Sequence, residues 1–188
     1  KTAPGQDRQD VQNEISIGLR LKGKENVVDM IDTAVMRKAP PRGWCDTFVV
    51  FERCDRSLER EIFDRCVPEP RWLSQTEAMA CAADLCRGLF NIHAADIIHR
   101  DIAPRNVLVV VDVSGNLLLK HADFGLAKKT GPRPLSSTVR HGSGSVAPEL
   151  REAFYQDKLF TDVPYDGKKA DVYSLGVAIM SLLLLNCA

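Results

Sequence analysis

The fold is decided by the stretch His-Arg-Asp-Ile-Ala-Pro-Arg-Asn, which occupies residues 99–106. Ala-Asp-Phe-Gly follows at residues 122–125, and Ala-Pro-Glu follows at residues 147–149. Residues 107–112 and 117–121 are short apolar runs on either side of Ser-Gly-Asn, a pattern typical of a β-hairpin. The chain therefore presents an acidic loop, a hairpin, a second acidic turn and a third short motif in that order.

The residues before this stretch predict a helix, two strands and a second helix. Residues 8–21 have apolar side chains at helical spacing, whereas residues 27–35 and 47–52 are β-branched and aromatic runs separated by Pro and Gly. A capping box, formed by Ser74 and Glu77, starts a helix of about 18 residues. The stripes that we expect to face inward are Val11, Ile15 and Leu19 in the first helix, and Met79, Ala82, Cys86, Leu89 and His93 in the second.

The C-terminal third of the chain predicts a long loop and a buried helix. Residues 128–146 have no apolar period and are rich in Gly, Pro, Ser and Arg. The helical period returns with Val172, Leu175, Ile179 and Leu182, whose neighbours are apolar on nearly every side. We expect this helix to lie in the middle of a core.

Composition excludes several classes of function. The chain has 188 residues, of which 45% are hydrophobic, so we expect a single domain with one sizeable core. Lys plus Arg and Asp plus Glu both number 25, which leaves no basic field for nucleic acid or anionic lipid. The longest apolar stretch, residues 177–185, is about half of the length that a membrane span needs. We therefore expect no nucleic-acid partner and no membrane span.

The three quoted segments resemble the H-R-D-x-x-x-x-N, D-F-G and A-P-E signatures of protein kinases, with a hairpin where that family has one. Residues 171–176, Asp-Val-Tyr-Ser-Leu-Gly, are similar to the family's D-V-W-S-x-G helix entry. The resemblance runs along the whole chain. It implies an incomplete two-lobe kinase fold of the α+β class. Residues 1–54 would form a remnant small lobe and hinge, with one helix and two or three strands, and residues 55–188 would form part of a mainly helical large lobe.

The resemblance implies ATP and Mg²⁺ as cofactors and a protein as substrate. Phosphoryl transfer depends on positioning and charge neutralisation more than on covalent chemistry. Asp101 would accept or orient the proton of the substrate hydroxyl, and Asn106 and Asp123 would be the magnesium ligands. A turn role for Asp101 or Asn106 is the structural alternative, but a structural loop has no need of all three residues together.

Other residues of these motifs have supporting roles in the resemblance. His99 is expected to hold loop backbone and not to act as a base, and Phe124 is expected to pack. Gly125 would let the backbone turn just after the metal ligand.

Two upstream residues complete the implied phosphate site. Glu14 matches the glutamate that pairs with the lysine holding the α- and β-phosphates. Lys1 is the candidate for that lysine, and a solvated terminal lysine is an equal alternative. No glycine-rich loop that could cover phosphates occurs in these 188 residues.

Residues 48–54 resemble the strand and hinge between the two kinase lobes, where main-chain groups contact adenine. By that likeness Phe51 would close the back of the nucleotide pocket, and Glu52 and Cys54 would offer main-chain hydrogen bonds. A plain strand end is the alternative.

The segment after Gly125 corresponds to an activation loop. Its candidate phosphorylation sites are Ser136, Ser137 and Thr138, and the cations that could pair with a phosphate there are Arg100, Lys128 and Lys129. A solvated loop rich in hydroxyl groups is an equal alternative.

The catalytic loop departs from the pattern of Ser/Thr kinases. Ala103 stands where those enzymes carry a lysine that touches the transferring phosphate. Arg105 resembles instead the arginine with which tyrosine kinases reach the same region, so we count it among the catalytic candidates. Residues 141–146 resemble a shortened Ser/Thr-type substrate loop. The acceptor, Ser/Thr or Tyr, therefore stays open.

We expect a fragment of an ATP-dependent protein kinase that transfers the γ-phosphoryl group to a protein hydroxyl. A pseudokinase that binds nucleotide or partners without catalysis, or a small-molecule phosphotransferase, is the alternative. The chain begins with Lys1, and the arginine partner of Glu149 is absent, so we expect the isolated chain to be poorly stable and nearly inactive. Its cysteines form no Cys-x-x-Cys pair, which favours buried free thiols in the cytoplasm or nucleus. The kinase domain of a membrane receptor is a further alternative.

Overall fold

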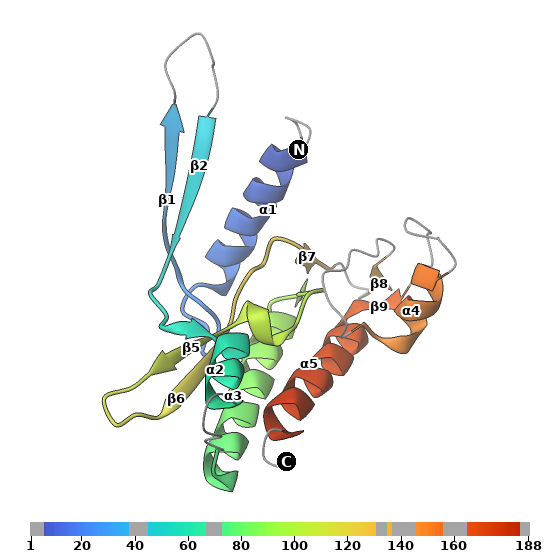
Figure 1. Cartoon of the computed structure of the whole chain (residues 1–188). Coiled ribbons are helices and arrows are strands. Elements are labelled where there is room, and N and C mark those ends of the chain that lie inside the picture. The colour runs from blue at the N-terminus through green and yellow to red at the C-terminus, as the bar shows by residue number, and fades with distance from the viewer. Residues whose placement is uncertain are drawn as a thin grey trace.

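The structure is a computed structural model that describes residues 6–37, 45–66, 73–130, 135–136, 146–155 and 165–184. The helices are α1 (Gln6–Leu21), α2 (Leu58–Cys66), α3 (Gln75–Ala94), α4 (Pro148–Tyr155) and α5 (Gly167–Leu184), with a 3-10 turn over Pro104–Asn106. The strands are β1 (Met30–Arg37), β2 (Cys45–Phe51), β3 (Arg56–Ser57), β4 (Ile97–Ile98), β5 (Val107–Val111), β6 (Leu117–His121), β7 (Lys128–Lys129), β8 (Leu135–Ser136) and β9 (Tyr165–Asp166). Small sheets are intermixed with helices, and the predicted α+β class is confirmed (Figure 1).

Helix α1 stands beside the antiparallel hairpin β1–β2 (Figure 1). Ile17 and Leu21 are buried, and Val11 and Ile15 are partly buried, but Leu19 is 59% exposed, so its predicted inward position is wrong. Strand β1 also begins three residues later than predicted. The preceding residues pair instead with β6, because the His121 N–H donates to Asn26 O at 2.9 Å and the Val28 N–H donates to His121 O at 2.9 Å.

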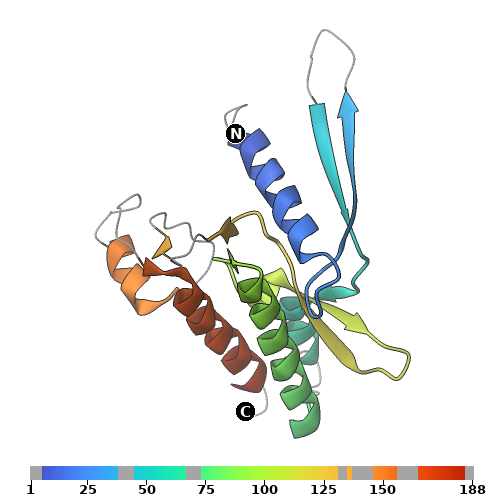
Figure 2. The same cartoon turned by 180° about the vertical axis from the view of Figure 1, so that it is seen from behind.

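The capping box of α3 is confirmed, and of the predicted inward residues Leu89 is buried, whereas the prediction is wrong for Met79 and Cys86. The Glu77 N–H donates to Ser74 Oγ at 3.2 Å, and the Ser74 N–H donates to the Glu77 carboxylate at 2.7 Å. Met79 is 63% exposed and Cys86 is exposed. The inward face consists of Ala78, Cys81, Asp84, Leu85, Gly88, Leu89 and Ile92. It faces β6 and α5, which lie against α3 in both views (Figures 1 and 2).

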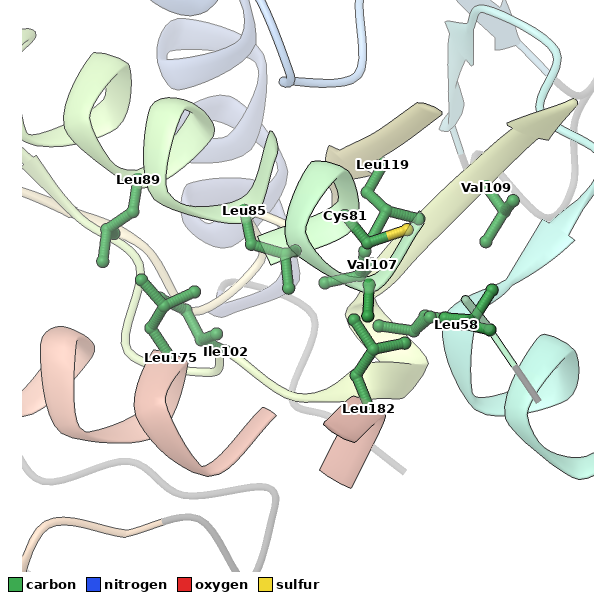
Figure 3. Packing of buried hydrophobic residues seen from close by; sticks show 12 residues of the cluster. Leu58, Cys81, Leu85, Leu89, Ile102, Val107, Val109, Leu119, Leu175 and Leu182 are labelled. Carbon is green, nitrogen blue, oxygen red and sulfur yellow. The ribbon is translucent and has the colours of Figure 1, made fainter. Parts of the chain in front are cut away.

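The main core lies between α3, the hairpin β5–β6 and α5 (Figure 3). Leu85 and Leu89 project from α3 toward Leu175 and Leu182 of α5. The other side of α5 is open in the described part of the chain, since Val172 and Met180 are both 57% exposed. Leu175 and Leu182 thus lie in the core as predicted, whereas the predicted inward position of Val172 is wrong.

Gly88 allows α3 to approach the segment before β1 closely. A Cβ atom at this position would lie 2.5 Å from the Asn26 carbonyl oxygen and 2.5 Å from Cδ2 of His121. Both distances are far below van der Waals contact, and one of the two atoms belongs to the backbone. A residue without Cβ is therefore required where α3 crosses Asn26 and β6.

The hairpin β5–β6 is confirmed, and its tip is closed by its own hydrogen bonds. The Asp112 carboxylate accepts the N–H groups of Ser114 and Asn116, both at 2.8 Å. Gly115 takes φ +84°, which a glycine adopts without strain. Val113 at the tip is fully exposed. The turn is thus formed without help from the rest of the molecule.

Four cysteines have described side chains, and all four are free thiols. Cys81 is buried, Cys54 and Cys66 are partly buried, and Cys86 is exposed, so the prediction of buried thiols is wrong for Cys86. The side chains of Cys45 and Cys187 lie outside the described residues. Within the described ranges, no helix has the length and apolar character that crossing a membrane requires.

Candidate active site

The loop that carries Asp101 is anchored by Asp171 of α5. The buried Asp171 carboxylate accepts the main-chain N–H groups of His99 at 2.7 Å and Arg100 at 2.8 Å, and it lies 2.9 Å from Nε2 of His93. The sequence marks Asp171 only as part of a kinase-like motif, and this anchoring role was not predicted. The sequence signal for this role is an acidic residue inside an otherwise apolar helix, because a buried carboxylate requires hydrogen-bond donors.

His99 joins the Asp101 loop to the residue before Asp123. Its Nε2 lies 3.0 Å from the carbonyl oxygen of Ala122, and its Nδ1 accepts the Asp101 N–H at 3.4 Å. One ring nitrogen donates and the other accepts, which is the pattern of a neutral imidazole. His99 is fully buried and holds backbone on both sides, as predicted from the sequence.

Arg105 and Asn106 hold the Asp101 side chain. Nη2 of Arg105 donates to both carboxylate oxygens, at 2.7 and 2.9 Å, and Nδ2 of Asn106 donates to Oδ2 at 2.8 Å. Nδ2 of Asn106 also donates to the Asp101 carbonyl at 2.8 Å. A turn cap would instead accept main-chain N–H groups. These contacts fix the carboxylate by side chains and favour a chemical role over a turn role.

Asp123 lies next to this cluster. The Ala122 N–H donates to the Asn106 carbonyl at 2.9 Å, so two hydrogen bonds lead from Asp101 to the residue before Asp123. Asp123 is exposed and takes φ +60°, a left-handed conformation that is uncommon for a residue with Cβ. Such strain is found at functional sites more often than elsewhere.

Phe124 and Gly125 support Asp123 in different ways. Phe124 is buried, with its ring centroid 5.0 Å from that of His99, and its predicted packing role is confirmed. Gly125 lies in a turn, as predicted, although it does not take a left-handed conformation. A Cβ there would lie 3.3 Å from Oδ1 of Asp123, so the absence of Cβ leaves room for that carboxylate.

The donor set of this cluster fits Mg²⁺. Among the described residues, no three His, Cys, Asp or Glu side chains converge as a metal site. Asp123 contributes an exposed carboxylate, and the bonds from Nδ2 of Asn106 leave its amide oxygen on the opposite side of the group. Mg²⁺ is commonly held by one or two protein oxygens together with waters and substrate phosphates. The residues present therefore suit Mg²⁺ that arrives with a nucleotide.

Helix α1 brings Glu14 toward Asp123. Burial raises the pKa of the Glu14 carboxyl, and the nearby negative charge of Asp123 raises this pKa further. Nδ2 of Asn13 donates to the Ala127 carbonyl at 2.8 Å and ties the helix to the segment after Asp123. Two neighbouring carboxylates favour a cation between them. Lys1, the predicted cation, lies outside the described residues.

The predicted hinge follows β2. The Glu52 N–H donates to Asp29 O at 2.9 Å. Of the two main-chain groups of Glu52, only the carbonyl is therefore left to contact adenine. Its carboxylate binds Nζ of Lys120. Phe51 and Cys54 are partly buried, and burial, followed by the charge of Glu52, raises the pKa of the Cys54 thiol.

The predicted activation segment is described only in part. Nε of Arg100 donates to the Leu126 carbonyl at 2.6 Å, and Nζ of Lys129 donates to Oγ of Ser16 at 2.5 Å. The main chain of Ser136 pairs with Tyr165 in the small sheet β8–β9. Ser137, Thr138 and residues 141–145 lie outside the described residues, as does the side chain of Ser136.

Glu149 lies in the first turn of α4 and does not have the predicted surroundings. The absence of an arginine partner predicts a costly buried carboxylate at this position, but Glu149 is exposed. Water can solvate an exposed carboxylate, so the predicted penalty at this position does not arise.

Comparison with known families agrees with this geometry. The family described as "Protein kinase domain" matches residues 1–187. The chain belongs to the protein kinase family.

Relatives with known names are moderately similar. The chain is 30% identical to Serine/threonine-protein kinase par-4 of Caenorhabditis elegans over 176 residues, which are 93% of this chain and 26% of that protein. It is 28% identical to Calcium-dependent protein kinase 2 of Zea mays, over 94% of this chain and 30% of that protein. It is 29% identical to Serine/threonine-protein kinase chk1 of Schizosaccharomyces pombe, over 93% of this chain and 30% of that protein. The chain thus spans less than a third of the length of these relatives.

Proposed function

We propose that the protein transfers the γ-phosphoryl group of ATP to a hydroxyl group of a protein substrate. The observation that carries this proposal is the hydrogen-bonded path from Asp101 through Asn106 to Ala122, which holds the predicted base beside the predicted metal ligand Asp123. Residues 1–54 would form the small lobe and hinge, and residues 55–188 would belong to the large lobe.

The reaction forms a bond between the substrate oxygen and the γ-phosphorus and breaks the bond to the β–γ bridging oxygen, releasing ADP. Asp101 accepts the proton of the hydroxyl, and its contacts with Arg105 and Asn106 keep the carboxylate oriented for this transfer. Bound Mg²⁺ neutralises phosphate charge, and Asn106 and Asp123 would hold it. Glu14 would orient the lysine that contacts the nucleotide phosphates, for which Lys1 is the candidate.

Arg105 also bears on the acceptor. Ala103 is buried and carries no charge, so the Arg105 guanidinium beside Asp101 is the cation that could face the transferred phosphoryl group. This substitution of Arg for Lys is similar to tyrosine kinases, whereas two of the relatives are named serine/threonine kinases. Analysis of the phosphorylated amino acids in a substrate distinguishes the two acceptors.

The test is phosphate transfer from radiolabelled ATP by the full-length protein. We expect Asp101→Asn to lower kcat by about 10²–10⁴-fold, because the hydroxyl proton loses its acceptor. Asp112→Asn at the exposed hairpin tip makes the same chemical change and should leave kcat unaltered.

Nucleotide binding is measured separately by alkylation of the partly buried Cys54 thiol. MgATP should slow this alkylation if adenine lies against the hinge. Protection of Cys54 without any phosphate transfer would indicate a pseudokinase, and absence of both would contradict the proposal.

A further inference from the structure

Lys120 of β6 and Glu52 of the predicted hinge form a close ion pair. Nζ of Lys120 lies 2.7 Å from Oε1 and 2.6 Å from Oε2 of Glu52, so the ammonium group bridges the carboxylate. The side chains are only 17% and 25% exposed. By contrast, Lys169 and Asp166 are 3.9 Å apart, with the lysine side chain 82% exposed.

The Glu52 carboxylate accepts a third hydrogen bond, which comes from another segment. The Asp29 N–H donates to Oε1 of Glu52 at 2.7 Å, and the Glu52 N–H donates back to Asp29 O at 2.9 Å. Asp29 precedes β1, Glu52 follows β2, and Lys120 lies on β6. One carboxylate therefore joins three segments that are distant in the sequence.

The pair has direct geometric consequences for the hinge. The Glu52 side chain is held toward Asp29 and Lys120, and its N–H is occupied, so its carbonyl is the group left for a ligand. Lys120 also precedes Asp123 by three residues on the same stretch of chain. The contact thus links the predicted adenine-binding groups to the predicted metal ligand.

The energetics of the Glu52–Lys120 ion pair indicate that it fixes the orientation of the Glu52 side chain. Exposed ion pairs contribute little, because water and salt screen the charges and the side chains lose rotamer freedom. A largely buried carboxylate with two cationic contacts and one main-chain donor is held in a single orientation, since losing the cation would leave a charge poorly solvated. The hinge conformation should therefore depend on Lys120.

We propose that Lys120 is a positioning residue for nucleotide binding, which orients the main-chain groups of Glu52 and Cys54 relative to Asp123 through its ion pair with the Glu52 carboxylate. This inference rests on the proposed function, since it presupposes that adenine contacts the hinge. Lys120 acts through Glu52 and does not itself touch the nucleotide.

The experiment compares the full-length protein with Lys120→Met, Lys120→Arg, Glu52→Gln and the double variant Lys120→Met/Glu52→Gln. Lys169→Met is the matched control, because it removes the same charge from an exposed pair. Amide hydrogen exchange of residues 51–55 measures the hinge without requiring activity. Initial rates at varied ATP concentration then separate KM for ATP from kcat.

We expect Lys120→Met to speed amide hydrogen exchange in the hinge and to raise KM for ATP about tenfold, which corresponds to a loss of about 1.4 kcal/mol in binding. The value of kcat should stay within about twofold of the original value, because the chemical step is not altered. Lys120→Arg should restore both quantities, and Lys169→Met should change neither. The double variant should be no worse than Lys120→Met, since both changes remove one interaction.

Three outcomes would overturn the inference: an unchanged KM for ATP in Lys120→Met, a fall in kcat with unchanged KM, or failure of Lys120→Arg to restore KM. Failure of the proposed function has a different signature. The unaltered protein would then transfer no phosphate from radiolabelled ATP, whatever the exchange rates of the hinge.

Discussion

Replacement of Asp171 by Ala should cost more stability than any exposed substitution. The carboxylate accepts two main-chain N–H groups, at 2.7 and 2.8 Å, and contacts the His93 ring at 2.9 Å. A buried donor left without its partner costs about 1–3 kcal/mol, and breaking a buried charged contact costs about 3–5 kcal/mol in total. We therefore expect Asp171→Ala to lower the free energy of unfolding by about 3–5 kcal/mol.

The same change should also slow the reaction, because residues 99 and 100 lead directly into Asp101. A displacement of a reacting group by about 1 Å can cost about 10²-fold in rate. Urea unfolding of the full-length protein measures the free energy, and kcat is measured on protein that remains folded. Asp64→Ala is the control, since Asp64 pairs with Arg60 at 2.8 Å on the surface of α2 and should change the free energy by only about 0.5 kcal/mol.

A free energy of unfolding that falls by less than about 1 kcal/mol in Asp171→Ala would refute this reasoning. So would an unaltered kcat, since Asp101 would then be positioned without the α5 carboxylate.

Two further predictions concern the strand that leads to Asp123. Gly88→Ala should destabilise the fold by about 1–3 kcal/mol, because its Cβ would overlap Asn26 O and His121. Gly176→Ala is the control, since its Cβ would meet open space and should stabilise α5 by up to about 1 kcal/mol. Equal changes of the two variants in the free energy of urea unfolding would contradict this prediction. Burial, followed by electrostatic repulsion from a proton on the neighbouring His99 ring, lowers the pKa of His121 from 6.5 to about 4. The unfolded chain therefore takes up the proton first, and stability is lost as the pH falls from 6.5 to about 4. Between pH 7.5 and pH 5 the free energy of unfolding should fall by about 2 kcal/mol less in His121→Gln than in the unaltered protein. An identical pH dependence of the two proteins would exclude His121 as the cause.

Short sequence motifs predicted the helix cap, the hairpin and the loop that carries Asp101. The capping box at Ser74, the hairpin β5–β6 and the loop around Asp101 all depend on residues close together in the sequence, and the structure has each of them. The resemblance to protein kinases in residues 99–106 and 122–125 also agrees with the family match.

The inward faces of the helices could not be predicted in the same way. Helix α3 has apolar residues on two sides, and its buried side is distinguished by Asp84 and Gly88, which apolar periodicity does not count. Asp84 is inward because its carboxylate accepts the Leu119 N–H of β6 at 3.0 Å, and Gly88 because of the close approach to Asn26. Contacts between distant segments decide both positions. The Glu52–Lys120 pair, separated by 68 residues, was missed for the same reason.

The self-contained turn between β5 and β6 makes this tip a place to attach a reporter. Its hydrogen bonds run among residues 112–116, and Val113 contributes no buried surface. An epitope or a fluorophore grafted at Val113 should therefore leave the proposed phosphate transfer and the folding cooperativity as they were, since loop tips of this kind tolerate insertions. The hairpin could then carry a probe in cells while the loops around Asp101 and Asp123 keep their native sequence.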